Sequence, residues 1–370
     1  MKVLHIVGFA EDQGGVLSVI RNLQGANIDR DWSHAVWVQD LYEEMRTPHL
    51  DYRFSRFARD GNISPSLLLN MLPALFSLRQ LLKRESFDII HSHSRGTLPL
   101  AVLITKFLRR PVIFTNHNYA SRKGLYRWAS RQERMHTVVL TRNMGRYYGI
   151  DMESPMTSVI SAFCADRFFD EPLVQRRTCY SPESKLRLLG VGLVTEWKGW
   201  HTVCNAFNLL TAEERACVEF DHWGDVRDPE YGQRLEAYVR EHNLSESVRF
   251  RGATDNMVAE LNKADWLVHP AIMDPFPVAV IEALSVGLPA LVSNCGGPVD
   301  MVRPGESGVL FEPDDAADLA EKIRSVIRGE VSAMPPKKIR ESVRHLSASQ
   351  VATSYYDLYS HVLTSGRGSH

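Results

Sequence analysis

The sequence predicts an α/β protein made of two Rossmann-like domains, and three observations lead to this fold class. The chain has 370 residues, more than the ~250 to 300 residues at which one hydrophobic core usually stops growing. Short runs rich in β-branched residues alternate with longer helical patterns, as they do in parallel βαβ units. This alternation lapses once, near the middle, and then restarts, so each half is expected to form its own sheet.

Six strands are expected in the N-terminal half, because short apolar runs there are separated by turn residues or by helical patterns. They cover residues 2–9, 35–39, 88–93, 111–117, 137–141 and 157–161. Helices are expected from about Leu17 and over residues 67–82. Since strands and helices alternate along the chain, the helices should cover both faces of a parallel sheet.

After Ser161 the pattern lapses into a polar segment that contains Pro172 and Pro182, and it restarts with the buried strand LRLLGVGLV. We therefore divide the chain into domains of residues 1–165 and 166–349. The second half is expected to hold one helix over residues 278–287 and strands over residues 186–194, 218–225, 248–252, 265–271, 289–293 and 308–313. This order again predicts a Rossmann-like domain.

The last expected helix, from about Ser347 to Leu363, carries an amphipathic stripe. The stripe is formed by Val351, Tyr355, Leu358 and Val362. Such a stripe needs a surface that buries it, so we expect this helix, about 350–365, to cross back and pack on the N-terminal domain. The final residues GRGSH are expected to be unstructured.

Composition excludes several classes of protein. The chain is 44% hydrophobic and 24% charged, which is typical of a folded globular protein. Its five cysteines are scattered and form no Cys-x-x-Cys pair, which argues against a disulfide framework and a structural zinc site and favours a reducing cytoplasm. Glu11 and Asp12 end the first apolar run too early for a signal peptide. The other apolar runs are shorter than the ~18 residues that span a bilayer.

The strongest functional signal is DPFPVAVIEALSVGLPALVSNCGGPVD, residues 274–300. Asp274 is expected in a loop, Pro277 can begin a helix, and Glu282 then lies more than one turn inside that helix. Free backbone N–H groups at the helix start would form a binding site for a diphosphate. Taken alone, Glu282 could be a solvated residue and Gly296-Gly297 an ordinary turn. The whole string, in order between two buried strands, favours a functional site.

This segment resembles the signature of the family-4 retaining glycosyltransferases: an acidic residue, seven residues, Glu, then small-x-Gly-x-Pro and Gly-Gly. The resemblance covers nearly the whole chain and implies the GT-B fold, in which two Rossmann-like domains face each other across a cleft and the last helix crosses back to the first domain. It implies that Asp274 holds sugar hydroxyls and that Glu282 holds the ribose hydroxyls of a nucleotide sugar. The donor-binding residues that it implies are Gly15, Lys198, Asp274, Phe276, Pro277, Val278 and Glu282.

A second motif is GVGLVTEWKGW at residues 190–200, which overlaps the end of the first strand of the second domain and places Lys198 and Gly199 after it. Its Lys198-Gly199 pair resembles the family's Gly-Arg-Leu-x-x-x-Lys-Gly, in which Arg and Lys neutralise the donor diphosphate. Lys198 would stabilise the charge that develops as the nucleoside diphosphate leaves, so it is a catalytic candidate together with Asp274. Two residues depart from the family: Leu193 replaces the Arg, and Asp274 replaces a Glu. Either the donor preference differs or another cation substitutes.

On the acceptor side the resemblance points to Gly14, His93 and His117, with His117 as a third catalytic candidate. Glycines after the first strand let the backbone approach a ligand, and His93 and His117 end two strands, where open α/β sheets place ligands. His91 and His93 would share one face of their strand, which also suits a metal. No third ligand lies nearby in sequence, so no metal site is expected.

The two halves differ in charge. Residues 1–165 carry 21 Lys and Arg against 14 Asp and Glu. Because the whole chain has 43 Lys and Arg and 44 Asp and Glu, residues 166–370 carry 22 against 30. The segment 122–146 contains seven basic residues, and the aromatic residues Tyr126 and Trp128 lie between them. This segment is either a solvated helical face or a surface for anionic lipid headgroups or an acceptor diphosphate. No nucleic-acid-binding motif accompanies it.

Together these features predict a retaining glycosyltransferase of the hexosyl type that moves a sugar from a nucleoside diphosphate, expected to be UDP, to an acceptor hydroxyl. No cofactor or metal is expected, because the Asp-x-Asp at residues 29–31 is far from the donor motifs. The expected setting is bacterial surface polysaccharide or lipid-linked glycan assembly, by a cytoplasmic enzyme that can attach peripherally to the inner face of the membrane. The alternatives are glycosylation of a soluble small molecule, a nucleotide-sugar epimerase of the same architecture, and a catalytically silent nucleotide-sugar-binding protein.

Overall fold

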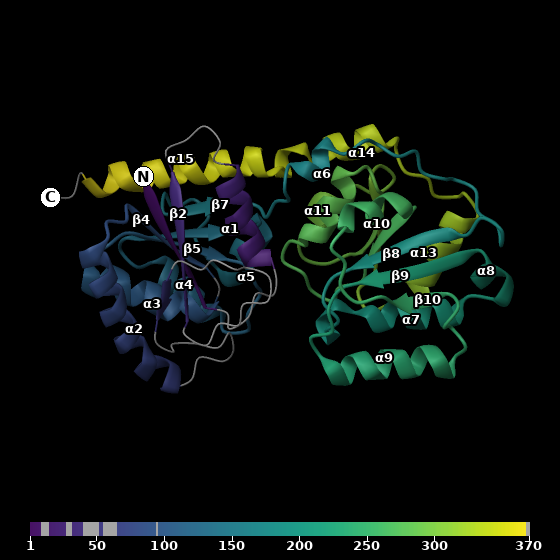
Figure 1. The fold of residues 1–370 in the computed structure, drawn as a ribbon, viewed down its shortest axis with the longest axis horizontal. Helices are drawn as coiled ribbons and strands as arrows, with labels where there is room; N and C mark the ends of the chain where they lie inside the picture. The colour runs from purple at the N-terminus through teal and green to yellow at the C-terminus, as the bar shows by residue number, and fades with distance from the viewer. Residues whose placement is uncertain (9–14, 27–31, 40–51, 55–64, 94, 368–370) are drawn as a thin grey trace. The chain divides into compact units, whose positions relative to one another are not determined.

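The computed structural model describes residues 1–8, 15–26, 32–39, 52–54, 65–93 and 95–367. The chain divides into two compact units, which the ribbon in Figure 1 shows. The first unit combines Met1–Phe163 with Ala348–His370, and the second is Cys164–Ser347. Each division falls two residues before the domain boundary that the sequence pattern places there.

The first unit is built on a parallel sheet. Among the described residues its strand order is β3-β2-β1-β4-β5-β6-β7, and every neighbouring pair is parallel. The strands are β1 (Lys2–Val7), β2 (Ser33–Gln39), β3 (Tyr52–Phe54), β4 (Ile89–His93), β5 (Val112–Asn116), β6 (Met135–Val139) and β7 (Thr157–Val159). The six strands expected in this half are present, and β3 is an addition that the apolar pattern does not predict.

Helices lie on both sides of this sheet (Figure 1). They are α1 (Gly15–Gly25), α2 (Pro65–Arg84), α3 (Leu98–Leu103), α4 (Lys123–Ser130), α5 (Arg142–Tyr148) and α15 (Ala348–Arg367). A 3-10 turn, η1 (Arg95–Thr97), precedes α3, and a π-helical turn, η2 (Ile104–Leu108), continues it.

The C-terminal helix α15 closes the core of the first unit. Its predicted stripe is buried, since none of its four residues, Val351, Tyr355, Leu358 and Val362, is more than 7% exposed. They pack in one cluster with apolar side chains of β1, β4, β5 and β6 and with Leu23 of α1. The prediction that the last helix returns to the first domain is therefore confirmed.

The second unit has its own parallel sheet, with the strand order β10-β9-β8-β11-β12-β13 among the described residues. The strands are β8 (Leu186–Val191), β9 (Val218–Trp223), β10 (Val248–Phe250), β11 (Trp266–His269), β12 (Ala290–Ser293) and β13 (Gly308–Phe311). The helices and 3-10 turns are α6 (Arg167–Asp170), η3 (Glu196–Lys198), α7 (Trp200–Leu209), α8 (Ala212–Ala216), α9 (Pro229–Glu241), α10 (Met257–Lys263), α11 (Val278–Ser285), α12 (Pro298–Met301), α13 (Ala316–Ile327), α14 (Pro336–Ser342) and η4 (Arg344–Leu346).

One face of the second sheet carries the core of this unit. Side chains of β8 and β9 that alternate toward this face pack against α7, α9 and α13. Trp200, Phe207 and Phe220 are fully buried there. The sheet thus fixes the ends of β8 and β11, after which Lys198 and Asp274 follow in the chain.

Candidate functional site

Lys198 lies in a tight connection after strand β8. The chain passes through the turn η3 and enters α7 at Gly199, whose φ of 70° is a left-handed conformation that favours glycine. A Cβ at Gly199 would lie 2.2 Å from the carbonyl oxygen of Pro270. Only glycine therefore allows the turn to approach the segment after β11. This close approach brings Lys198 to Asp274.

The carboxylate of Asp274 is buried and accepts three hydrogen bonds. Oδ2 accepts from Lys198 Nζ at 2.7 Å and from His269 Nε2 at 3.2 Å, and Oδ1 accepts from the backbone N–H of Phe276 at 3.2 Å. Burial by itself would raise the pKa of Asp274, but the Lys198 ammonium and His269 hold this pKa well below its usual range. Lys198 and Asp274 consequently form a buried ion pair after the strand ends.

The Gly-Gly pair of the motif supports the Asp274 loop. Gly296 has a φ of 57°, and a Cβ at this position would lie 2.0 Å from the carbonyl oxygen of Asp274. The N–H of Gly297 donates a hydrogen bond to the same oxygen at 2.8 Å. A side chain at Gly296 would therefore displace the Asp274 loop. The Gly-Gly pair thus holds this loop in place and is not only a turn.

Helix α11 begins at Val278, where the sequence pattern places its start, and Pro277 is the residue before it. Pro277 offers no side-chain cap, and the first N–H groups of a helix have no partner inside it. Glu282 lies one turn further along and is half-buried. Burial raises the pKa of Glu282 to about 7, opposed in part by the charge of Arg167. Beside Asp274 the helix thus presents an uncapped end with partial positive charge.

His269 is a member of this site that the sequence motifs do not single out. It is the last residue of the buried strand β11. This position could have identified it from the sequence, because ligands bind at the carboxyl ends of parallel strands. Its Nδ1 and the hydroxyl of Thr195 are buried without a hydrogen-bond partner in the described part of the chain. Leu193 contributes its carbonyl oxygen, which accepts from Trp200 Nε1 at 2.9 Å. Among the lysines and arginines of the described residues, the one that forms an ion pair with Asp274 is Lys198.

The acceptor-side residues belong to the first unit. His93 ends β4 and His117 directly follows β5, and their facing nitrogens, His93 Nδ1 and His117 Nε2, are 3.1 Å apart. Gly14 lies outside the described residues, and Gly15, which the resemblance assigns to the donor, is the first residue of α1 in the same unit. The predicted residues thus form two groups, one in each unit.

A third histidine joins His91 and His93, although none lies near them in sequence. His5 of β1 pairs with His91 in the sheet register, and one ligand nitrogen from each of the three imidazoles lies within 4.8 Å of the others. All three are buried, and burial lowers the pKa of each. Three imidazoles at this spacing are a possible ligand set for a transition metal. The prediction of no metal stays a prediction.

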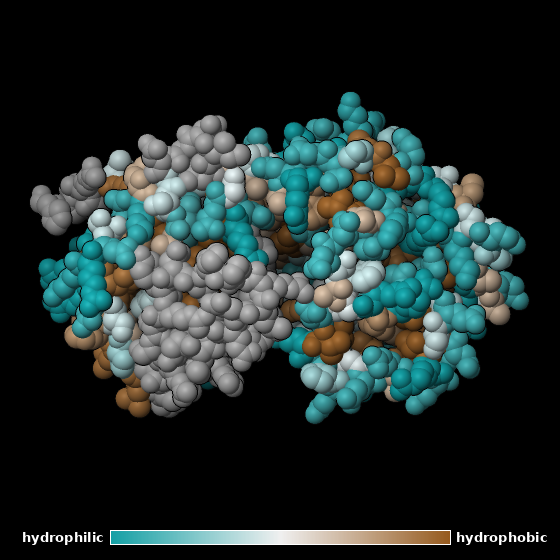
Figure 2. All heavy atoms as spheres, viewed as in Figure 1, coloured by the Kyte–Doolittle hydropathy of each residue, from teal (hydrophilic) through white to brown (hydrophobic). Residues whose placement is uncertain are grey.

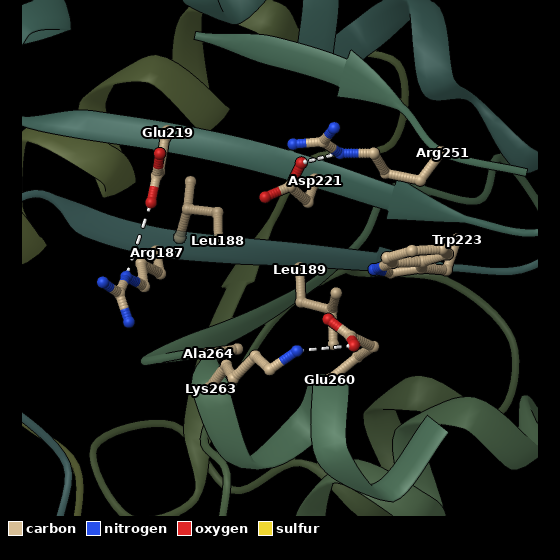
Figure 3. Close-up of a pocket in the computed structure, with 10 residues that line it drawn as sticks. All are labelled: Arg187, Leu188, Leu189, Glu219, Asp221, Trp223, Arg251, Glu260, Lys263 and Ala264. Carbon is tan, nitrogen blue, oxygen red and sulfur yellow. Dashed lines mark hydrogen bonds and ion pairs between the residues drawn. The ribbon is translucent and has the colours of Figure 1, made fainter. Parts of the chain in front are cut away.

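The described part of the second unit also contains an open cavity of about 520 Å³, between β8, β9 and α10 (Figure 3). Its charged side chains form ion pairs with one another: Arg187 with Glu219 at 3.4 Å, Arg251 with Asp221 at 2.7 Å, and Lys263 with Glu260 at 2.8 Å. None of the residues that the motifs predict lines this cavity. It is therefore separate from the candidate donor site.

Two family profiles match this chain, one in each half. The profile described as Glycosyltransferase Family 4 matches residues 13–147, and the profile described as Glycosyl transferases group 1 matches residues 175–345. The chain therefore belongs to the family-4, group 1 glycosyltransferases, and its structural neighbours are GT-B enzymes.

Individual relatives and solved structures match this chain over different shares of its length. A 2-deoxystreptamine N-acetyl-D-glucosaminyltransferase of Niallia circulans is 24% identical over 298 residues, which are 74% of each chain. A lipopolysaccharide 1,6-galactosyltransferase of Escherichia coli strain K12 is 28% identical over 138 residues, 36% of this chain and 37% of that one. HepE of Anabaena, solved in complex with UDP-glucose, shares the fold with a TM-score of 0.76 at 16% identity over 98% of this chain and 100% of its own. These findings confirm the fold class and the glycosyltransferase class.

Proposed function

We propose that this protein transfers a sugar from a UDP-linked donor to an acceptor hydroxyl, with retention of configuration at the anomeric carbon. The observation that carries the proposal is the buried Lys198–Asp274 ion pair beside the uncapped start of α11. A lysine and a helix N-terminus together suit a diphosphate. The UDP-glucose complex of the Anabaena neighbour supports UDP as the nucleotide.

Each donor-site residue has a distinct role in this proposal. The diphosphate lies against the backbone from Phe276 to Val278, at the start of α11. The Asp274 carboxylate, which the Lys198 ion pair keeps ionised at neutral pH, accepts hydrogen bonds from sugar hydroxyls. Glu282, half-buried one turn along the helix, bonds the ribose hydroxyls.

Lys198 acts on the leaving group. As the bond between the anomeric carbon and the diphosphate breaks and a bond to the acceptor oxygen forms, negative charge collects on the diphosphate, and the acceptor hydroxyl gives its proton to the departing diphosphate oxygen. A preorganised ammonium stabilises this charge more than it stabilises the bound donor, which accelerates the reaction. Because the chain supplies this cation itself, we propose that transfer requires no divalent metal. His93 and His117, with Gly14, form the acceptor side, and Gly15 contacts the donor.

Ligand-induced stabilisation and product release together test this proposal. A UDP-sugar that binds the folded protein raises its melting temperature by mass action, so a thermal-shift screen identifies the donor. Release of UDP should then depend on an acceptor. Stabilisation without release would support the silent sugar-nucleotide-binding protein, and conversion of the donor to its epimer would support the epimerase. A screen in which no nucleotide sugar stabilises the protein would contradict all three.

For the acceptor, we propose a lipid-linked glycan of bacterial surface polysaccharide assembly. The Escherichia coli relative is a lipopolysaccharide galactosyltransferase. In the segment 122–146 most basic side chains are exposed, as is Trp128, whereas Tyr126 is buried. Lys106 Nζ lies 5.0 Å from the Trp128 ring. The exposed part of this segment therefore combines basic and aromatic groups.

Helix α2 adds an exposed apolar stripe to the same unit. Leu69, Leu72 and Phe76 are 73%, 61% and 62% exposed, at spacings of three and four residues that put them on one face. Basic residues Lys83 and Arg84 lie in the last turn. Figure 2 shows apolar residues at the surface in the area where Figure 1 places α2. An apolar stripe with neighbouring basic residues suits a helix that lies in a membrane interface. No described helix is long and apolar enough to cross a membrane.

The second candidate acceptor is a soluble small molecule. The observation that favours it is the Niallia circulans relative, which matches 74% of each chain and is a transferase for 2-deoxystreptamine. Such an enzyme needs no membrane surface. Binding to vesicles therefore decides between the two acceptors.

A further inference from the structure

A row of hydrogen-bonded imidazoles links helix α15 to the end of β5. The Oη of Tyr356 is 3.2 Å from Nε2 of His34, and Nδ1 of His34 is 2.8 Å from Nε2 of His5. Nδ1 of His5 is 2.9 Å from Nε2 of His93, and Nδ1 of His93 is 3.1 Å from Nε2 of His117. We refer to His34, His5, His93 and His117, in this order, as the histidine row.

The direction of the row is set at Tyr356. Its hydroxyl donates its single proton to the carbonyl oxygen of Leu23 at 2.8 Å, and a carbonyl has no hydrogen to donate in return. The hydroxyl oxygen therefore accepts a hydrogen from Nε2 of His34. A neutral imidazole has one N–H and one lone pair, so Nδ1 of His34 accepts from Nε2 of His5, and the same pattern repeats along the row. Every member is consequently the Nε2–H tautomer.

The surroundings of the histidine row keep its imidazoles neutral. His5 and His93 are fully buried, and burial lowers their pKa values well below the usual range. Burial also lowers the pKa of His34 and of His117 to about 4. Among the described residues, no carboxylate makes a hydrogen bond to the row that would favour a second ring proton. At neutral pH each member therefore carries one ring proton.

We propose that Tyr356 and the histidine row fix the tautomer of His117 and leave its Nδ1 as a lone-pair acceptor for a hydroxyl of the bound substrate. His117 is only half-buried, and within the described residues its Nδ1 makes no hydrogen bond. A fixed lone pair accepts a hydrogen from a hydroxyl and repels an ether or carbonyl oxygen, so it selects a substrate without using charge. The identity of this substrate rests on the proposed function, whereas the tautomer does not. Tyr356, His34, His5 and His93 are positioning residues.

A metal held by His5, His91 and His93 is the competing interpretation. Both nitrogens of His91 already have partners, Tyr359 Oη at 2.7 Å and Thr115 Oγ1 at 2.7 Å. With the direction set at Tyr356, Nε2 of His93 carries a hydrogen, whereas a metal ligand must offer a lone pair. A metal would thus break hydrogen bonds of both His91 and the row. We expect the full-length protein to bind no zinc stoichiometrically.

Nitrogen NMR of the full-length protein labelled with ¹⁵N-histidine tests the tautomer, because two-bond correlations distinguish a protonated ring nitrogen from an unprotonated one. His117→Gln assigns the signals of His117. In the wild type we expect hydrogen on Nε2 alone. Tyr356→Phe removes the acceptor for His34, so the Nδ1–H form of His117 should become populated. Tyr359→Phe is the matched control, since it removes a buried hydroxyl of the same helix from His91, outside the row.

Activity tests the second half of the inference. With the donor and acceptor found by the UDP-release assay, Tyr356→Phe should lower kcat/KM about tenfold, the cost of one hydrogen bond at the upper end of the usual range, and Tyr359→Phe should stay close to wild type. Circular dichroism and melting temperatures verify that both variants fold. If no UDP-sugar and acceptor react at all, the proposed function fails while the NMR result still decides the tautomer.

Three outcomes would overturn the inference. The first is hydrogen on Nδ1 of His117 in the wild type, a measurement that does not depend on any variant folding. The second is a Tyr356→Phe protein with the wild-type tautomer, or with an altered tautomer and unaltered kcat/KM. The third is stoichiometric zinc binding that shifts the signals of His5, His91 and His93 together.

Discussion

Lys198 is the residue whose charge matters most to the proposed reaction. Lys198→Ala should lower kcat more than it weakens donor binding, because negative charge on the diphosphate increases as the bond breaks. Removing a charged hydrogen-bond partner costs about 1.5 to 3 kcal/mol, or roughly ten- to a hundredfold. Steady-state kinetics of UDP release checks this, with Lys263→Ala as a control on an exposed ion pair of the same unit. An equal loss in both variants, or none in Lys198→Ala, would remove Lys198 from the site.

Glu282 should make stability depend on pH. Its pKa is about 7 in the folded protein against an ordinary value of 4.5, so between these values the folded state binds the proton more tightly. The free energy of unfolding should therefore decrease as the pH rises from about 4.5 to about 7, and the stabilisation is complete only below this range. Glu282→Gln lacks this titration.

Melting curves of the ligand-free wild type and Glu282→Gln, at about pH 5 and about pH 8, measure this effect. The variant should gain stability relative to the wild type at the higher pH. The same variant should bind the UDP-sugar more weakly, because it loses hydrogen bonds to the ribose. A stability difference that is independent of pH would show that Glu282 titrates normally.

The individual site residues were predictable only where a motif marks them. Lys198, Asp274 and Glu282 stand in two recognisable strings, and the structure brings the first two together as an ion pair. His269 has no motif, and its role follows from the three-dimensional end of β11. Tyr356 lies 322 positions from His34, so no local pattern could reveal their contact. Hydrogen-bond direction and burial, which decide the chemistry of these groups, appear only in the fold.

Helix α15 should contribute strongly to the stability of the first unit, since its stripe is buried in the core of that unit. Leu358→Ala removes a buried side chain and should lower the free energy of unfolding by about 2 to 5 kcal/mol. Leu69→Ala on α2 is the matched control, because that leucine is 73% exposed. Denaturant unfolding measures both. Similar effects of the two substitutions would contradict the burial of the stripe.

The exposed stripe of α2 and the segment 122–146 should attach the protein to anionic membranes. Attraction to such a surface is about 1 kcal/mol per basic residue and weakens with salt. Sedimentation with vesicles should show binding to anionic lipid at low ionic strength and little binding to neutral lipid. Changing Arg131 and Arg146 together to Glu, or Leu72 and Phe76 together to Ser, should reduce it.

Negligible binding of the wild type to both kinds of vesicle would show that these residues are solvated surface residues without a role in membrane attachment. It would also favour the soluble acceptor over the lipid-linked glycan. Equal binding of wild type and variants would show that another surface makes the contact. Melting temperatures of the variants control for loss of folding.

Secondary structure was predictable where apolar runs are long enough to show a period. The strands and the three helices expected from such runs are present, and α15 follows the spacing of its stripe. β3 has three residues, Tyr52–Phe54, too few to show alternation. The start of α11 at Val278 agrees with the helix expected over residues 278–287, and Pro277 occupies the position before it.

The molecule supplies its own cation at the candidate donor site, so transfer should not need a divalent metal. Turnover should be unchanged in EDTA and should not increase when magnesium or manganese is added. The Asp-x-Asp at residues 29–31 lies outside the described residues. Complete loss of turnover in EDTA, restored by either ion, would refute the assignment of this role to Lys198.

The return of the chain to its first unit has a consequence for biosynthesis. Because Ala348–Arg367 follows the whole second unit in sequence, a ribosome finishes Cys164–Ser347 before it makes the helix that closes the first core. During this interval the apolar face formed by β1, β4, β5 and β6 has no α15 to cover it, and Tyr356 is not yet present to orient the imidazoles. Nascent chains are therefore expected to depend on chaperones most at this stage. A premature stop codon in α15 would release a protein whose second unit is intact and whose first unit is a target for proteolysis.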